Sequence, residues 1–339
     1  MAKRPDYDVA VVGAGPAGSR TARNIARAGF RVALLEEHRR IGVPSHCSGL
    51  ISPRTLALGE TRDGVVINQV RGAYIHAIGG REVALGADDV RAVAIDRIRW
   101  DELLAEQAQA AGAEMVRARL VQAERQDGCV RLRCQRDGHD LTLTARLVVG
   151  ADGAHSRVAR SLGLPKPRES VYALGLEGRL RVPRPDFVHV FVGRRLAPSW
   201  FGWIIPLDDD RVRVGIGCDF SQRPIACYRR LVEAFPHLFD NLQVGHMYGG
   251  TIPTGFAPRT YADNVMLVGD AAGQVKPLSG GGIYTGLVAA GHCAGVAVAA
   301  LASDDLSAAA LRSYEVAWRR EIGHELARSA SIRRFGLAL

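Results

Sequence analysis

The stretch Val11-Val12-Gly13-Ala14-Gly15-Pro16-Ala17-Gly18 decides the fold of the first part of the chain. Residues 8–12 form an apolar run that predicts a buried parallel strand, and residues 17–28 have helical spacing that stops at Gly29. Residues 31–35 predict a second strand, which Glu36 closes. The result is a strand–turn–helix–strand unit, the context in which a G-x-G-x-x-G turn binds a dinucleotide.

Each of the three glycines of the motif has its own structural role. Gly13 permits the tight turn, Gly15 lets a pyrophosphate approach the backbone, and Gly18 allows close packing of helix on strand. The helix beginning near Pro16 directs free N–H groups and the positive end of its dipole at the phosphates. The Glu36 carboxylate can accept both ribose hydroxyls and disfavours a 2′-phosphate, which argues against NADP as the resident ligand.

Two further glycine–acid turns follow, Gly150-Ala151-Asp152-Gly153 and Gly269-Asp270-Ala271-Ala272-Gly273. Asp152 is suited to cap a helix beside the dinucleotide loop. Asp270 follows a predicted strand over residues 265–268 and can bind a ribityl chain. Three such turns in this order indicate a chain that returns twice to one long flavin cofactor.

A row of glycines, Gly280-Gly281-Gly282-Ile283, predicts the start of another helix. Its bare N–H groups and positive dipole end would stabilise the negative charge that a flavin develops at N1 and O2 on reduction. An NAD dehydrogenase has no use for such an arrangement.

Bulk composition bounds the remaining possibilities. The chain has 339 residues, 47% of them hydrophobic, and a net charge of +9, which suits anionic substrates, an acidic electron donor or an anionic membrane surface. Its basic residues are scattered, so nucleic-acid binding is not expected. The six cysteines form no close metal-ligand pairs, and we expect no metal and a reducing cytoplasm. The start of the sequence carries no secretory signal pattern, and the apolar residues 280–302 predict a buried helix.

The pattern along the chain predicts an α/β protein with a discontinuous, Rossmann-like FAD-binding domain over residues 1–65, 94–168 and 251–305. Period-two runs such as residues 187–192 and 212–216 predict an inserted, mostly antiparallel substrate domain over residues 66–93 and 169–250. Residues 306–339 form the third part, in which we expect one terminal helix over residues 306–335. Its apolar stripe is expected to pack on the domain, with contact to a membrane surface as a secondary hypothesis. The stripe comprises Leu311, Tyr314, Trp318, Ile322 and Leu326.

The second glycine turn, with Ser156-Arg157 after it, matches the second flavin motif of the para-hydroxybenzoate hydroxylase-like flavoproteins. Within that class the chain resembles the geranylgeranyl reductases, most specifically in the loop Ile41-Gly42-Val43-Pro44-Ser45-His46-Cys47-Ser48-Gly49 and in Pro277-Leu278-Ser279-Gly280-Gly281-Gly282-Ile283. The stretches Asp96-Arg97, Phe201-Gly202-Trp203-Ile204-Ile205-Pro206 and Gly250-Thr251-Ile252-Pro253 agree with the same family.

The resemblance implies non-covalent FAD and the reduction of C=C bonds in an isoprenoid, or geranylgeranyl, chain. Arg97 would reach the pyrophosphate and Val121 would contribute backbone groups to the adenine. The FAD contacts carried over in full are Ala17, Glu36, Cys47, Ser48, Gly49, Arg97, Val121, Asp270, Gly282 and Ile283.

Alkene reduction requires hydride on one carbon and a proton on the other, in a site that positions the chain and excludes water. Phe201, Trp203 and Ile205, with Pro206 after them, are the candidate lining of an apolar tunnel. Cys47 is the candidate catalytic residue, either as the proton donor or as a residue that seats the flavin ring.

Two other functions remain open from the sequence. A flavin monooxygenase or halogenase shares the scaffold, and Trp203-x-Ile205-Pro206 is similar to the halogenase tryptophan motif. However, the sequence has no lysine between Lys3 and Lys166, where halogenases carry a catalytic one. The other alternative is a flavin-binding redox subunit without turnover of its own, which has no need of the glycine row.

The electron donor is expected to bind transiently, as NADPH or as ferredoxin, because no second nucleotide-binding unit is evident. The expected partner is a prenyl lipid. The expected location is the cytoplasm, with peripheral membrane association as a further hypothesis. The oligomeric state, the prenyl substrate and the number of bonds reduced are not fixed by the sequence.

Overall fold

A computed structural model describes residues 4–61, 64–86 and 88–336 of the chain. Its contacts divide the chain into two compact units. Unit 1 comprises Met1–Val43, Asp101–Glu169 and Pro253–Ala330, and unit 2 comprises Pro44–Trp100, Ser170–Ile252 and Ser331–Leu339. This division by contacts assigns residues 44–65 and 94–100 to unit 2; the functional domain bounds given above stay a prediction.

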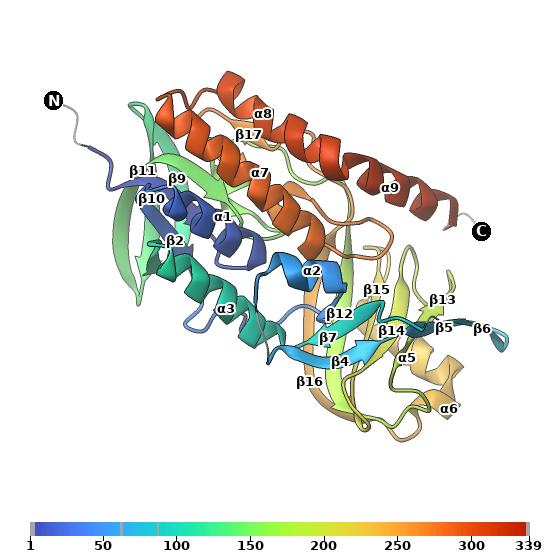
Figure 1. The fold of residues 1–339 in the computed structure, drawn as a ribbon. Helices are drawn as coiled ribbons and strands as arrows, with labels where there is room; N and C mark the ends of the chain where they lie inside the picture. The colour runs from blue at the N-terminus through green and yellow to red at the C-terminus, as the bar shows by residue number, and fades with distance from the viewer. Residues whose placement is uncertain (1–3, 62–63, 87, 337–339) are drawn as a thin grey trace. The chain divides into compact units, whose positions relative to one another are not determined.

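Unit 1 is built on an eight-stranded sheet in the order β17-β18-β11-β1-β2-β8, to which β10 and β9 are added beside β11 (Figure 1). Strands β18, β11, β1 and β2 run parallel, so their carboxyl ends share one edge. The strands are β1 Tyr7–Val12, β2 Val32–Glu36, β8 Glu114–Arg117, β9 Arg119–Gln126, β10 Cys129–Arg136, β11 His139–Gly150, β17 Tyr261–Ala262 and β18 Val265–Leu267.

Alternation along the buried strands separates two cores in unit 1. Val9 and Val11 pack into the core that α1 and α7 share, whereas Ala10 and Val12 pack into the core on the opposite face. The helical segments are α1 Pro16–Arg27, α3 Arg97–Ala110 (which begins in unit 2), α4 Arg157–Ser161, a 3-10 turn Gly269–Ala272, α7 Ile283–Ala302, α8 Ala308–Trp318 and α9 His324–Gly336.

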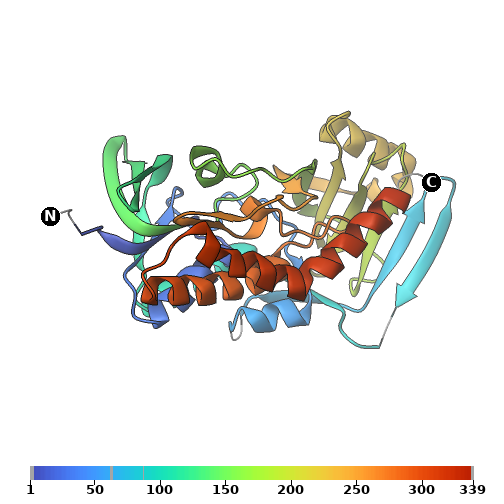
Figure 2. The ribbon, with the colours of Figure 1, turned by 90° about the horizontal axis from the view of Figure 1, so that it is seen from above.

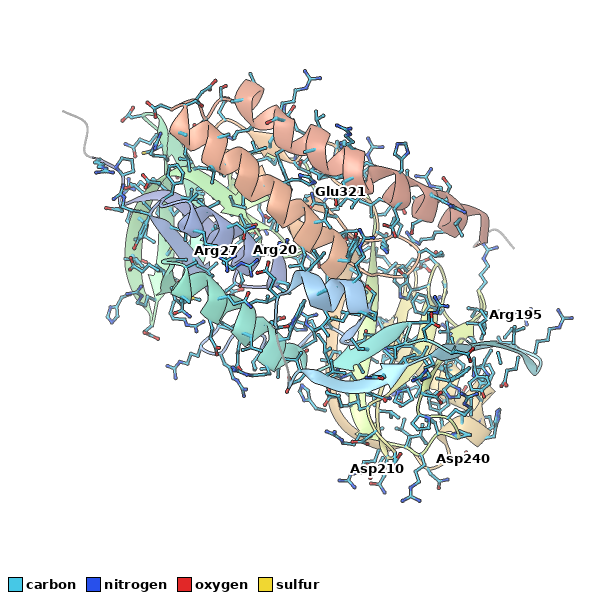
Figure 3. All side chains as sticks on the ribbon, in the orientation of Figure 1. Arg20, Arg27, Arg195, Asp210, Asp240 and Glu321 are labelled. Carbon is cyan, nitrogen blue, oxygen red and sulfur yellow. The ribbon has the colours of Figure 1, made fainter. Side chains whose placement is uncertain are left out.

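Helix α7 is apolar and long enough to cross a membrane, and it is the one such helix among the described residues. Of its most apolar stretch of 18 residues, 56% is buried inside the protein. Figure 3 labels Glu321 on the terminal helical segment, and its carboxylate lies 2.6 Å from Nε2 of His292 in α7. The helix predicted over residues 280–302 begins three residues later, at Ile283, and its buried residues pack into a core of unit 1.

The single helix predicted over residues 306–335 is wrong in one respect. The helical path is unbroken from α8 to the C-terminal segment (Figure 2), but a π-helical turn, Arg319–Gly323, separates α8 from α9. The stripe residues from Tyr314 to Leu326 recur every four positions, more than the 3.6 residues of an α-helical turn, and a wider turn keeps them aligned. All five stripe residues are buried, so this stripe offers no membrane-facing surface.

Unit 2 is built on a seven-stranded sheet in the order β16-β12-β15-β14-β13-β5-β6. All of its described pairings are antiparallel except β13 with β5, in agreement with the predicted period-two pattern. A small sheet orders β3-β7-β4. The strands are β3 Leu50–Ile51, β4 Val66–Val70, β5 Gly72–Ala77, β6 Arg81–Gly86, β7 Ala92–Ile95, β12 Ser170–Arg179, β13 Phe187–Val192, β14 Phe201–Pro206, β15 Arg211–Cys218 and β16 Gln243–Pro253.

Among the described residues, three helices lie wholly within unit 2, and the sequence pattern did not predict them: α2 Pro53–Leu58, α5 Pro224–Ala234 and α6 Pro236–Phe239. Each begins at a proline, which is tolerated in the first helical turn because the N–H it lacks has no intrahelical partner there. Helix α5 covers one face of the sheet, where Leu231 packs with Val214 and Ile216. The opposite face is left for the residues described below.

Candidate flavin and substrate sites

In unit 1 the glycine turn after β1 has the geometry that its sequence predicts. Gly13 has φ +102°, and a Cβ there would lie 2.4 Å from the carbonyl oxygen of Ala151. At Gly18 a Cβ would lie 1.9 Å from the Gly13 carbonyl oxygen, so α1 can approach β1 only without a side chain. A Cβ at Gly15 would meet no atom within 4 Å. The open side of the turn thus lies at Gly15, immediately before the first residue of α1.

The carboxylate of Glu36 lies over this turn. It accepts hydrogen bonds from the Ala14 N–H at 3.0 Å and from the His38 N–H at 2.9 Å. The Nδ1 atom of His38 lies 2.7 Å from the same carboxylate. Glu36 is therefore fixed at the carboxyl end of β2, beside the phosphate-binding turn, where a ribose would lie.

Asp152 caps the first turn of α4 rather than facing solvent. Its carboxylate accepts from the N–H groups of Arg157 (2.7 Å) and Val158 (3.0 Å) and from the hydroxyl of Ser156 (2.6 Å). Ser156 is the N-cap residue proper. Burial raises the pKa of Asp152 above its ordinary value, although these hydrogen bonds oppose the shift. Asp152 thus organises the loop after β11 through backbone contacts.

The third glycine turn and the glycine row come together. A Cβ at Gly282 would lie 3.2 Å from Oδ1 of Asp270, and Gly282 is the N-cap of α7, which begins at Ile283. Gly281, one residue earlier, is open apart from Ser279 and Lys276. The first N–H groups of α7 have no intrahelical partner by construction of an α-helix. A carboxylate and a helix N-terminus therefore meet at the carboxyl edge of the sheet.

Small residues allow helix α1 to pack closely against α7 and the third glycine turn. Cβ atoms built at Gly269 and Gly286 would lie 3.1 Å and 3.6 Å from Cβ of Ala17. Val121, on β9, is 42% exposed, so it is accessible to a ligand. The unit thus presents a glycine turn open at one residue, a fixed carboxylate after β2 and a helix N-terminus with an aspartate, which together fit a flavin dinucleotide.

Unit 2 holds the Cys47 loop through one buried arginine. Nη1 of Arg213 donates to the carbonyl oxygens of Ser48 (3.0 Å) and Ile95 (2.9 Å), and Nε donates to Glu177 at 2.7 Å. Its side chain is 8% exposed. A Cβ at Gly49, where φ is +68°, would lie 2.4 Å from this guanidinium, so the loop must carry glycine at that point. The sulfur of Cys47 accepts the Gly49 N–H at 3.4 Å.

Arg97 lies beside the same loop. Its Cγ would be 3.1 Å from a Cβ at Gly49, and its guanidinium carbon lies 6.0 Å from the centroid of the Trp100 ring. The structure thus brings four of the predicted cofactor residues, Cys47, Ser48, Gly49 and Arg97, into one corner of unit 2.

The aromatic motif on β14 divides between surface and core. Phe201 and Trp203 are half-buried, with ring centroids 5.9 Å apart. Ile205 is 2% exposed and belongs to a core cluster, and Pro206 is buried as well. Phe201 and Trp203 are thus the accessible members of the predicted substrate set; the substrate role of all four stays a prediction.

Two residues that the sequence reasoning missed lie with these groups. Arg213 interrupts an otherwise apolar strand, Val212 to Ile216, and a charge in such a run is a usable signal of a buried partner. Tyr248 on β16 has a buried hydroxyl with no hydrogen-bond partner in the described structure. Nothing in the local pattern around Tyr248 distinguishes it, because its neighbours on β16 are exposed.

Comparison with known proteins agrees with this geometry. A family model described as a FAD binding domain matches residues 6–330. The digeranylgeranylglycerophospholipid reductase of Methanothrix thermoacetophila is 34% identical over 98% of this chain and 88% of its own. An uncharacterized protein of Methanocaldococcus jannaschii is 34% identical over 99% of this chain and 86% of its own.

Solved structures agree as well. A geranylgeranyl bacteriochlorophyll reductase-like protein from Thermoplasma acidophilum superposes with a TM-score of 0.91 at 25% identity, covering 98% of this chain and 88% of its own. A flavin-dependent brominase, at 17% identity and a TM-score of 0.79 over 98% of this chain and 89% of its own, shares the fold. The chain therefore belongs to the geranylgeranyl reductase family of FAD-dependent oxidoreductases.

Proposed function

We propose that this protein saturates C=C bonds in the isoprenoid chains of a glycerol-based prenyl phospholipid. The support is a relative named as a digeranylgeranylglycerophospholipid reductase, which is 34% identical over 98% of this chain. The observation that carries the proposal is the corner of unit 2 in which a buried arginine fixes the Cys47 loop on the same sheet that carries Phe201 and Trp203. The aromatic face formed by Phe201 and Trp203 beside the Cys47 loop suits a hydrophobic alkene chain better than a charged metabolite.

Bound FAD in its reduced form would supply hydride. In unit 1, the turn at Gly15 and the N-terminus of α1 would hold its pyrophosphate, and Glu36 the adenosine ribose. Asp270 would bind the ribityl chain, and the backbone from Gly281 to Ile283 would face the pyrimidine edge.

The residues of unit 2 would do the remaining work. Phe201 and Trp203 would orient the prenyl chain and exclude water, which an unactivated alkene requires because positioning must contribute much of the rate. Cys47 is the candidate proton donor predicted from the sequence. Ser48, Gly49 and Arg97 would complete the cofactor contacts, with the fork of Arg97 toward the pyrophosphate.

We further propose that electrons arrive from NADPH or ferredoxin and that the protein works in the cytoplasm at the membrane surface where its lipid substrate resides. The net charge of +9 favours an acidic protein donor and an anionic lipid surface.

A direct test uses the protein reduced with dithionite under anaerobic conditions and given a digeranylgeranylglycerophospholipid, the lipid in the name of the relative above. We expect the flavin to be reoxidised and the lipid to gain two hydrogens for each bond reduced, by mass spectrometry. If the flavin is reoxidised only when oxygen is admitted, the result would instead support a monooxygenase or halogenase. No reoxidation by any prenyl lipid would favour the redox-subunit reading.

A variant of the cysteine tests its part. If Cys47 is the proton donor, Cys47→Ala should lower turnover by about 10²–10⁴-fold while FAD stays bound. Cys129→Ala is the matched control, because Cys129 is also partly exposed and lies in unit 1. Unchanged turnover in Cys47→Ala would show that Cys47 is not the proton donor and would leave it only the role of positioning the flavin ring.

A further inference from the structure

The face of the unit 2 sheet opposite α5 carries two aromatic rings over a pair of glycines. Gly175 on β12 is the direct partner of Gly215 on β15, and Gly215 is the partner of Trp203 on β14. A Cβ at Gly175 would lie 2.4 Å from Cε2 of Tyr248, and a Cβ at Gly215 would lie 2.2 Å from Cζ2 of Trp203. Each ring therefore covers one glycine of the pair.

The two glycines bring the rings close. Directly opposed residues in an antiparallel pair have Cα atoms about 4.5–5.5 Å apart, so the rings cover adjacent positions of the same surface. Any side chain at Gly175 or Gly215 would displace a ring. We call this surface, formed by Tyr248, Gly175, Gly215 and Trp203, the aromatic platform.

Both rings of the aromatic platform carry a polar atom that is buried and unsatisfied. In the described part of the chain, neither the Tyr248 hydroxyl nor Nε1 of Trp203 has a hydrogen-bond partner. Buried polar atoms are almost always paired, and an unpaired one needs an explanation such as a catalytic or ligand-binding role. Trp203 is one of the two aromatic residues that the proposed function assigns to the prenyl chain, and Tyr248 covers the neighbouring glycine of the same surface.

The platform adjoins the Cys47 loop on two sides. Gly250 lies two residues beyond Tyr248 on the same face of β16, and a Cβ there would be 3.5 Å from Cβ of His46. Arg213 lies two residues before Gly215 on β15 and holds the Ser48 carbonyl. The ionisable groups that act on the Tyr248 hydroxyl are Arg213, Cys47 and Glu177.

The protonation state of Tyr248 follows from its surroundings. Burial is the main cause that raises the pKa of Tyr248 above its ordinary value, and a charge on Cys47 or Glu177 would raise it further against the opposing effect of Arg213. The hydroxyl therefore keeps its proton throughout the neutral range.

On the basis of the proposed function, we propose that the Tyr248 hydroxyl is the proton donor of the alkene reduction. One alkene carbon receives hydride, with its electron pair, from the reduced flavin. The other carbon forms its new C–H bond with the proton of Tyr248 as the O–H bond breaks. The phenolate is then reprotonated by water, so that the net change is addition of H⁻ and H⁺ across the double bond. In this scheme Cys47 is not the proton donor and has the other role predicted for it from the sequence, that of a residue that seats the flavin ring.

The test compares Tyr248→Phe with wild type and with Tyr172→Phe. Tyr172 is the matched control because it lies on β12, is 39% exposed and packs against Phe220. We expect Tyr248→Phe to slow reoxidation of the prereduced flavin by the prenyl lipid about 10²–10⁴-fold, the range for general acid catalysis. Reoxidation by ferricyanide should be unchanged, and Tyr172→Phe should behave as wild type.

A second readout uses the protein with oxidised FAD bound, which carries no hydride to transfer to the lipid. Binding of the prenyl lipid, followed by quenching of tryptophan fluorescence, should be within about threefold of wild type in Tyr248→Phe, because a proton donor contributes little to binding an apolar chain. Thermal unfolding should also match wild type, since the ring that covers Gly175 is kept.

The outcomes separate this inference from the proposed function. If wild type reduces the lipid and Tyr248→Phe does so at a similar rate, Tyr248 is not the donor. If Tyr248→Phe loses lipid binding or unfolds early, the hydroxyl has a structural role and the inference is overturned. If wild type itself fails with every prenyl lipid, the proposed function falls, and this inference with it.

Discussion

Replacing Arg213 by methionine should loosen the Cys47 loop and destabilise unit 2. The change removes three hydrogen bonds, to Ser48, Ile95 and Glu177, from a side chain that is 8% exposed. Breaking a buried charged pair costs about 3–5 kcal/mol, but Glu177 is 51% exposed and can rehydrate. We therefore expect the low end, about 3 kcal/mol, or a fall in Tm of roughly 6–12 °C.

The assay has two arms. Thermal unfolding gives the stability, and the rate at which a thiol reagent labels Cys47, in a Cys129→Ala background, gives the opening of the loop. These two cysteines are partly exposed and the other four are buried. Labelling of Cys47 should accelerate in Arg213→Met because the carbonyl anchors of its loop are gone.

The matched control is Arg179→Met in the same unit. Arg179 donates to Asp210 at 3.0 Å, but it is 67% exposed, and such surface pairs contribute about 0–1 kcal/mol. A loss of less than about 1 kcal/mol in Arg213→Met, with unchanged labelling of Cys47, would refute the view that this arginine holds the loop.

Other predictions test unit 1 and the histidines of unit 2. Gly15→Ala should keep wild-type stability, because its Cβ meets no protein atom, yet purify with less FAD; a fully yellow variant would contradict the placement of the pyrophosphate. Gly18→Ala should instead lose about 1–3 kcal/mol in urea unfolding, since its Cβ would lie 1.9 Å from the Gly13 carbonyl oxygen. Burial, then nearby His76, lowers the pKa of His189 from 6.5 to about 4. As pH falls, His189 takes up a proton in the unfolded chain before it does so in the folded protein. Neutral His189 therefore costs no stability above pH 6.5, and about 3 kcal/mol of the free energy of unfolding is lost as the pH falls toward 4. This loss should be smaller in His189→Phe, and an equal loss in the variant would exclude His189 as its source.

The local patterns of unit 1 carry strong information, and most of its elements follow from them. The residues of β1, α1 and β2 form a unit whose turn admits only glycine at two points, and period and spacing reveal it directly. Asp270 and Gly282 are also predictable, because each stands at the end of an apolar strand or the start of a helix. The structure adds that they lie side by side, because a Cβ built at Gly282 would be 3.2 Å from Oδ1 of Asp270.

The sequence was less informative about secondary structure where a helix interrupts a run of strands or where the helical period changes. Helix α5 lies within a region of alternating strands, and only its starting proline marks it. The π-helical turn after Trp318 keeps the apolar stripe of the terminal helices facing the core of unit 1. The sequence shows the spacing of the stripe residues but not the core against which they must align.

The sequence by itself determined the cofactor class, because a phosphate-binding turn needs glycines and a carboxylate at fixed separations along one strand–helix–strand unit. It also determined the family, through the loop around Cys47. Only the tertiary structure decided which side chains support that loop and which polar atoms stay unpaired. Arg213 and Tyr248 act across strands whose partners lie far away in sequence, since β12 and β16 are separated by β13, β14 and β15. Strand pairing sets those contacts, and no local pattern encodes the pairing of strands so distant along the chain.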